Sequence, residues 1–176
     1  MKYLVVLLSL SILSVNAKLT VNEETIHYTV TPSSPETMMR EITEAFPLNK
    51  SGGSYQGYTK YKINWNFRTS QKRHSCRVTK VKTKLKLEFT MPKLESDDPE
   101  VKKAWDRWFP DLQSYLEGQG EIAKDYAAKI DEGIKNLKPR GDCKVLQNEA
   151  NKIGQKFLED LNEQLFVYKE SSDKFR

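Results

Sequence analysis

The sequence predicts an α+β domain in which a small antiparallel sheet packs against two long helices and one short N-terminal helix. Two observations lead to this class. The middle of the chain alternates apolar and basic residues, as half-buried strands do, and the last third repeats apolar residues at spacings of three and four, as amphipathic helices do. The chain has 176 residues, of which 30% are charged and 10% aromatic, a composition typical of one folded domain with its own core.

Residues 1–17 have the pattern of a secretory signal peptide. Lys2 supplies the positive start, residues 3–15 form an apolar run, and Val15-Asn16-Ala17 is a small-residue cleavage site. We expect cleavage after Ala17 and a mature protein that is secreted or periplasmic. No later stretch is apolar enough to cross a bilayer, so we expect no transmembrane span after cleavage.

The domain is expected to cover residues 18–169, starting with a strand and a short helix. Ile26, Tyr28 and Val30 alternate with polar residues, which predicts a strand over 25–31. Ser34 before Pro35 is a typical helix start, and apolar residues continue at helical spacing as far as Phe46.

Two longer strands follow, over 58–67 and 77–91. Apolar residues of the second strand share one face, and Lys80, Lys82, Lys84 and Lys86 share the other. The connection over 69–75 is polar and basic, so we expect the two strands to form a hairpin.

Two long helices complete the domain. The first begins after the acidic Asp97–Glu100 segment and carries Trp105, Trp108, Leu112 and Leu116 on one face. The second begins at the capping residue Asp142, and residues 170–176 form a polar tail.

Cys76 and Cys143 are the two cysteines of the chain. An exported protein folds in an oxidising compartment, so a disulfide between them is the expected state, with two buried free thiols as the alternative. Two cysteines without a nearby histidine do not make a zinc site.

The segment Glu117-Gly118-Gln119-Gly120-Glu121 lies in the middle of the first long helix. Its surroundings resemble a family of secreted, zincin-like zinc proteases, the domain of unknown function 922, in which these five positions read HExGH. The residues that carry the resemblance are Tyr28-Thr29-Val30, Gly57, Thr59, Trp65, Cys76, Val78, Val81, Met91-Pro92, Trp105, Phe109, Leu112, Cys143, Tyr168, Ser172 and Asp173. The resemblance covers nearly the whole mature chain and implies a zincin-like fold.

The same resemblance implies that the zinc site has been lost. In an HExGH helix the two histidines bind zinc and the glutamate activates the bound water. Here these positions hold Glu117, Glu121 and Gly118, and Lys174 falls where the family has its third histidine. We therefore expect no metal, no cofactor and no catalytic residue at these degenerate positions.

Three functions stay open at this stage. The first is a catalytically inactive zincin-like domain that binds or scaffolds in the cell envelope, with a protein or an anionic envelope polymer as its partner. The second is a residual or altered hydrolase that uses Glu117 and Glu121, although both are equally readable as solvated residues of a helix face. The third is a polyanion-binding protein that uses Lys80, Lys82, Lys84 and Lys86.

The basic strands themselves have two readings. Residues 60–88 hold ten Lys and Arg and one acid, and such a stripe attracts polyanions. The alternative is a solvated outer face that also blocks edge-to-edge aggregation. Nucleic acid is not the expected partner, because Tyr61, Trp65 and Phe67 face away from the lysines and read as core rather than as a stacking platform.

The charges at the degenerate positions lead to one structural hypothesis. If the family's backbone is kept, Glu117, Glu121 and Lys174 converge where the metal would lie, and a salt bridge replaces the zinc. Lys124, three residues after Glu121, is a second lysine able to neutralise that carboxylate.

Overall fold

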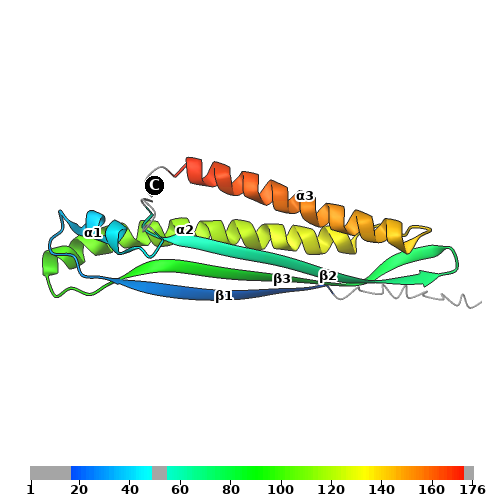
Figure 1. Ribbon diagram of the computed structural model, residues 1–176, viewed down its shortest axis with the longest axis horizontal. Coiled ribbons are helices and arrows are strands. Elements are labelled where there is room, and N and C mark those ends of the chain that lie inside the picture. Colours follow the sequence, from blue (N-terminus) through cyan, green and yellow to red (C-terminus); the bar gives the residue numbers. More distant parts are fainter. Residues whose placement is uncertain (1–16, 49–54, 173–176) are drawn as a thin grey trace, which may run out of the picture.

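The structure, a computed structural model, describes residues 17–48 and 55–172 (Figure 1). In these ranges the elements are β1 (Ala17–Val30), α1 (Met38–Ala45), β2 (Tyr58–Lys72), β3 (Ser75–Leu94), α2 (Pro99–Lys135) and α3 (Cys143–Glu170). The predicted α+β class is confirmed: a small sheet packs against two long helices, with the short helix α1 at one end (Figure 1).

The sheet has the order β1-β3-β2, with β3 in the middle. The expected antiparallel pairing holds for β2 and β3, but β1 pairs with β3 in parallel, so the sheet is mixed rather than wholly antiparallel. The reason is the path of the chain. After β1 the chain passes through α1, returns along β2 and turns into β3, which then runs in the same direction as β1. A parallel pair needs a long crossover connection, and here the segment between Val30 and Ser75, which includes α1 and β2, supplies it.

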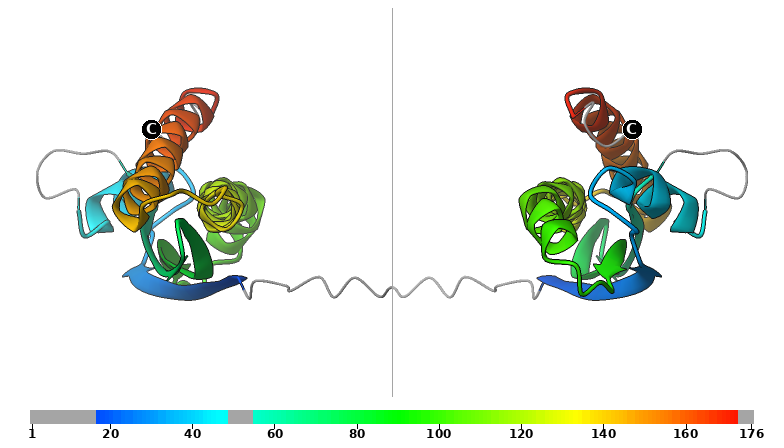
Figure 2. Two further views of the ribbon diagram at one scale, coloured as in Figure 1. Left: turned by 90° about the vertical axis from the view of Figure 1, so that its right-hand side faces the viewer. Right: turned by 90° about the vertical axis from the view of Figure 1, so that its left-hand side faces the viewer.

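The alternation along β3 gives the sheet two different faces. Val81, Leu85 and Leu87 are almost fully buried under the helices. Between them, Lys82, Lys84 and Lys86 are exposed on the opposite face, while Lys80 is partly buried. Both long helices lie on the same side of the sheet, which leaves the lysine side uncovered (Figure 2).

Helices α2 and α3 begin at side-chain caps. The Asp98 carboxylate accepts hydrogen bonds from the backbone N–H groups of Glu100 and Val101, at 2.8 and 3.3 Å. Asp142 caps α3 through the N–H of Lys144 at 2.7 Å. These bonds satisfy N–H groups that have no partner within the helix. Helix α2 continues through Pro110, whose ring is exposed.

The main core lies between the helices and the sheet. Its fully buried large side chains include Leu85, Leu87, Leu112, Leu116, Ile130, Ile134, Leu146 and Leu161. A second cluster joins α1 to the ends of β1 and α2 through Val30, Ile42, Phe46 and Trp105. The predicted apolar face of the first long helix is therefore confirmed at Trp105, Leu112 and Leu116, which are buried.

Two sequence predictions fall on residues that are largely or wholly outside the described ranges. The signal peptide is expected over 1–17, of which only Ala17 is described, and the polar tail over 170–176 is described only to Ser172. Within the described ranges, neither α2 nor α3, nor the shorter α1, contains an apolar stretch of the length and hydropathy that a membrane span requires.

Candidate functional site

A groove of about 720 Å³ lies between the edge strand β1 and helix α2. Its floor is formed by Phe89 and Met91 of β3. The strand side is lined by Glu23, Thr25 and His27, and the helix side by Phe109, Gln113, Ser114, Glu117, Gly118, Glu121 and Lys124. In-register pairing explains the strand side, because Glu23, Thr25 and His27 lie opposite Leu87, Phe89 and Met91 and so share their face of the sheet.

The pentapeptide Glu117-Gly118-Gln119-Gly120-Glu121 lies beside this groove. Glu117, Gly118 and Glu121 all line it, so the structure brings together three of the four predicted positions. Gly120 faces the sheet instead, where an added Cβ would come within 2.7 Å of the Phe89 ring. The helix thus approaches β3 closely while presenting its neighbouring residues to the groove. Lys174, the fourth position, lies outside the described residues.

A lysine does neutralise Glu121, and it is Lys124. Its Nζ lies 2.8 Å from Glu121 Oε1 and 2.7 Å from Glu23 Oε1 of β1. The hydrogen bonds to Glu121 and then Glu23 raise the pKa of Lys124 above its ordinary value. The resulting network, Glu23–Lys124–Glu121, joins the edge strand to the pentapeptide at one end of the groove.

Gly118 is covered by an aromatic side chain from α3. A Cβ at this position would overlap the Tyr168 hydroxyl oxygen and come within 2.8 Å of Tyr168 Cζ. Tyr168 also stacks on Tyr115, with ring centroids 5.7 Å apart, and burial raises its pKa. The end of α3 therefore lies over Gly118 of α2.

Glu117 and Glu121 are both exposed. Gln113 Nε2 donates a hydrogen bond of 2.7 Å to Glu117 Oε1, which satisfies that carboxylate one helical turn away. A pair of carboxylates that works as general acid and base needs one member in a low-dielectric surrounding that raises its pKa. The exposure of both side chains does not provide that surrounding.

The groove gives no obvious set of metal ligands. His27 lines it, whereas His74 lies in the turn between β2 and β3. Within residues 17–48 and 55–172, no three or more His, Cys, Asp or Glu side chains lie close enough together to hold a metal ion. Polar side chains that could contact a ligand here are the groove's His27, Thr25, Ser114 and Gln113.

The second predicted surface is the uncovered face of the sheet. Register places Lys62 opposite Lys86 and Arg68 opposite Lys80 on β2 and β3, so cations of neighbouring strands lie side by side. A hollow of about 370 Å³ is lined by Asn66, Phe67, Arg68, Lys80, Lys82 and Lys84. The predicted lysine stripe is thus part of a basic face that also includes residues of β2.

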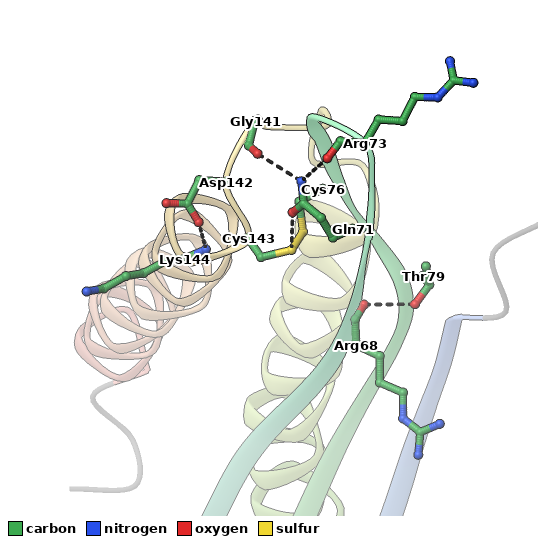
Figure 3. Close-up of a disulfide and its surroundings, with 9 residues drawn as sticks. All are labelled: Arg68, Gln71, Arg73, Cys76, Thr79, Gly141, Asp142, Cys143 and Lys144. Atoms are coloured by element: carbon green, nitrogen blue, oxygen red, sulfur yellow. Dashed lines mark hydrogen bonds between the residues drawn. A yellow bond between two sulfur atoms is a disulfide. The ribbon is translucent and has the colours of Figure 1, made fainter.

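The predicted disulfide is present between Cys76 and Cys143, whose Cα atoms are 5.1 Å apart (Figure 3). It joins the start of β3 to the start of α3. Backbone hydrogen bonds between Cys76 and Arg140, at 2.6 and 2.9 Å, hold the same junction. Gln71 Nε2 donates to the carbonyls of Arg73 and Gly141, each at 3.2 Å (Figure 3).

In a comparison with protein families, residues 25–173 match the family described as bacterial protein of unknown function (DUF922). The chain belongs to this family. The matched range of the DUF922 domain includes the basic face, both cysteines and all of the groove-lining residues except Glu23. Searches of curated proteins and of solved structures give no match.

Sequence reasoning missed three residues at the groove: Glu23 and His27, which line it, and Tyr168, which covers Gly118. Glu23 precedes the expected strand and His27 is one of its polar positions, and the partner of Glu23, Lys124, lies far along the chain in α2. Tyr168 was noted only as part of the family resemblance. Gly118 was the sequence feature that could have indicated this contact, because only a residue without a Cβ lets an aromatic ring pack so closely against the helix.

Proposed function

We propose that this domain is an exported, non-hydrolytic binding domain built on a zincin-like frame, acting by binding or scaffolding in the cell envelope. Its ligand site is the groove between β1 and α2, and the ligand is an extended segment of a partner protein. The expectation of export rests on the N-terminal signal pattern.

The Glu23–Lys124–Glu121 network carries this proposal. A zinc ion at the pentapeptide would need electron-pair donors such as imidazole or carboxylate directed at one point. Glu121, at a position of a metal-binding histidine in HExGH, instead accepts a hydrogen bond from an ammonium group at 2.8 Å. The cation that this carboxylate neutralises is a lysine side chain, shared with Glu23 of the edge strand.

Gly118 supports the same reading. The general base of an HExGH site is the glutamate at this position, and glycine supplies no group that can take a proton. Tyr168 and Tyr115 fill the neighbouring space. Two elements of a hydrolytic site are therefore replaced by packing and by an ion pair, while the groove itself is kept.

The edge strand supports a peptide ligand. Among the described elements β1 pairs with β3 alone, so the backbone along its other side is available to an added strand. Extended peptides bind such edges through main-chain hydrogen bonds and place alternate side chains in pockets. The apolar floor of Phe89 and Met91, with His27 and Thr25 beside it, provides such a surface.

Metal content and hydrolysis test the non-hydrolytic part. The purified protein, incubated with excess zinc and then desalted, should hold less than stoichiometric zinc by mass spectrometry and should not cleave casein. Stoichiometric zinc whose removal by a chelator abolishes cleavage would overturn the proposal.

Peptide binding tests the groove. Thr25→Trp fills the groove from β1, and Thr20→Trp places the same ring on the uncovered face of the same strand, because the two threonines have opposite parity in the register. Peptides selected on the parent protein should lose affinity for Thr25→Trp and keep it for Thr20→Trp. Equal affinity for both variants would place the peptide site elsewhere.

A further inference from the structure

We propose that the uncovered face of the sheet is a second binding site, independent of the groove, for a linear hydroxylated polymer that carries repeated phosphate or carboxylate groups. The site consists of Lys62 and Arg68 of β2 and Lys80, Lys82 and Lys84 of β3, with Asn64 and Asn66 between them.

The position of β3 removes one ordinary explanation of its lysines. Charged residues on edge strands keep sheets from pairing with other sheets. From Val81 onward, β3 is bordered by β1 on one side and β2 on the other, so Lys82, Lys84 and Lys86 protect no edge. A sheet face whose only role is to contact water usually carries both acidic and basic residues.

The cations of this face are placed at a cost to the fold. Lys62 lies opposite Lys86 and Arg68 opposite Lys80, and like charges in facing positions destabilise an antiparallel pair. Acidic residues neutralise only one end of the face, where Glu88 lies 3.9 Å from Lys60 and 3.7 Å from Lys86, and Glu24 of β1 lies 3.6 Å from Lys86. Among the described residues, Lys62, Arg68, Lys80, Lys82 and Lys84 form no ion pair with an acidic side chain, which leaves their charge for an external anion.

The spacing suits a linear polymer. Successive lysines of β3 stand two residues apart, which is roughly 6.8 Å along an extended strand. The polar side chains of β2 form a second row beside them, roughly 4.8 Å away. Near its end the hollow of about 370 Å³ gathers Arg68, Lys80, Lys82 and Lys84 around one point. One anionic group of the polymer would bind in this hollow, and the following groups of the polymer would lie along the row of lysines.

The neutral residues favour a hydroxylated chain over a nucleic acid. Register places Asn64 opposite Lys84 and Asn66 opposite Lys82, and both amides are exposed. Amide groups donate to and accept from hydroxyls, as a sugar or polyol chain requires. The aromatic residues Tyr61 and Trp65 of the same part of β2 lie on the helix side, and Phe67 alone of the three also borders the hollow, so these rows offer no series of rings on which successive bases could stack.

Binding of defined polymers to the purified protein tests the site. The probes are poly(glycerol phosphate) and polygalacturonate, with neutral dextran for the hydroxyls alone and a single-stranded oligothymidylate of equal charge for nucleic acid. We expect one or both anionic chains to bind and dextran not to bind. Affinity should fall steeply with salt, since bound cations release counterions from the polymer.

Charge reversal locates the site. Lys82→Glu/Lys84→Glu should weaken binding by at least roughly tenfold and reduce the salt slope by about 2, one for each lysine removed. The matched control is Lys144→Glu/Lys152→Glu, which makes the same charge change at exposed positions of α3. Thermal melting of both variants verifies that they fold.

The possible results distinguish a specific site on the sheet from attraction to net charge and from a nucleic-acid surface. Loss of affinity in the sheet variant alone supports the site, and the phosphate and carboxylate arms then identify the source of the anion. Equal losses in both variants would mean attraction to net charge only, and would overturn it. Tighter binding of the oligothymidylate than of either polymer would also overturn it, in favour of a nucleic-acid surface. A groove variant such as Thr25→Trp should leave all of these affinities unchanged.

Discussion

At the scale of single residues, Lys124 connects parts of the chain that lie far apart in sequence. Its ammonium group contacts Glu121 within α2 and Glu23 on β1, and its side chain is 28% exposed. Ion pairs at surfaces contribute little individually, but a charge shared by two carboxylates and partly shielded from water contributes more. The network is therefore expected to fix the width of the groove as well as to stabilise the fold.

Lys124→Met tests this network, because methionine keeps most of the aliphatic stem. The free energy of unfolding should fall by about 1 kcal/mol at low salt, and the loss should shrink as salt screens the charges. Chemical denaturation measures it. Lys129→Met is the control, since it breaks the Lys129–Asp125 pair and the contact of Lys129 with the Tyr126 ring, both within α2, and should have the smaller effect. Equal losses would show that the link to β1 contributes nothing.

The pH dependence of this network follows from the raised pKa of Lys124. A lysine whose pKa is higher in the folded state holds its proton more tightly there than in the unfolded chain. Its stabilisation is complete below the ordinary pKa of 10.5 and is lost as pH rises through the folded value. The stability difference between the parent and Lys124→Met should thus be constant near neutral pH and narrow above 10.5.

Gly118 and Tyr168 form the second residue-scale pair. Alanine in a helix is more favourable than glycine by about 1 kcal/mol, but here its Cβ would overlap the tyrosine ring. Forcing an extra methyl into a packed site typically costs about 1–3 kcal/mol. Gly118→Ala should therefore destabilise the parent protein and stabilise a Tyr168→Ala background. Thermal melting of the parent, the two single variants and the double variant measures this change of sign in the effect of Gly118→Ala. The same sign in both backgrounds would mean that Tyr168 moves aside freely.

At the scale of elements, the disulfide closes a loop of 67 residues that contains nearly all of β3 and the whole of α2. The chain-entropy model gives such a crosslink about 4 kcal/mol of stabilisation through the unfolded state. Cys76→Ser/Cys143→Ser should lower the free energy of unfolding by roughly that amount. Reduction of the parent protein should have a similar effect. Unchanged melting under full reduction would contradict the assignment of this crosslink as a main source of stability.

The elements themselves follow closely from local patterns. The alternation of β3 and the spacing of apolar residues in the two helices predicted their type and their buried faces. The hairpin connection was expected over 69–75, but pairing continues to Lys72 and resumes at Ser75, past a register shift at Arg68/Thr69. The polar composition of this stretch hides its extended backbone, because a bulge changes which side chains face the core.

What the sequence could not provide are pairings between distant segments. Nothing local distinguishes β1 beside β3 from β1 beside β2, since both arrangements bury the same residues. The ion pair between Glu121 and Lys124 is visible at a spacing of three, whereas its extension to Glu23 depends on the fold. The position of Tyr168 over Gly118 likewise depends on how α3 lies across α2.

At the scale of the whole molecule, charge is unevenly distributed: one face of the sheet is basic and the helices lie on the other (Figure 2). The facing Lys62 and Lys86 repel each other in the isolated protein. Salt should therefore raise the melting temperature. Lys62→Glu should stabilise by about 0.2–1 kcal/mol at low salt, because it creates an opposite-charge pair across the strands.

Lys93→Glu is the control for this charge change. It makes the same substitution on β3 at a position that faces Thr29 of β1 rather than a cation. It should leave the melting temperature nearly unchanged. If both variants gain equally, net charge rather than the facing pair is responsible.

The disulfide also makes the two ends of α3 unequal in stability. It fastens α3 at its first residue (Figure 3), whereas the other end of α3 is held by non-covalent contacts such as that of Tyr168 with Tyr115. Local opening should therefore start at the free end of α3 and travel toward the crosslink. Amide hydrogen exchange should be slowest near Leu146 and faster toward Leu165, and reduction should flatten this gradient. Because Tyr168 lies at the end that opens first, the cover over Gly118 is the part of the groove that thermal motion exposes most often.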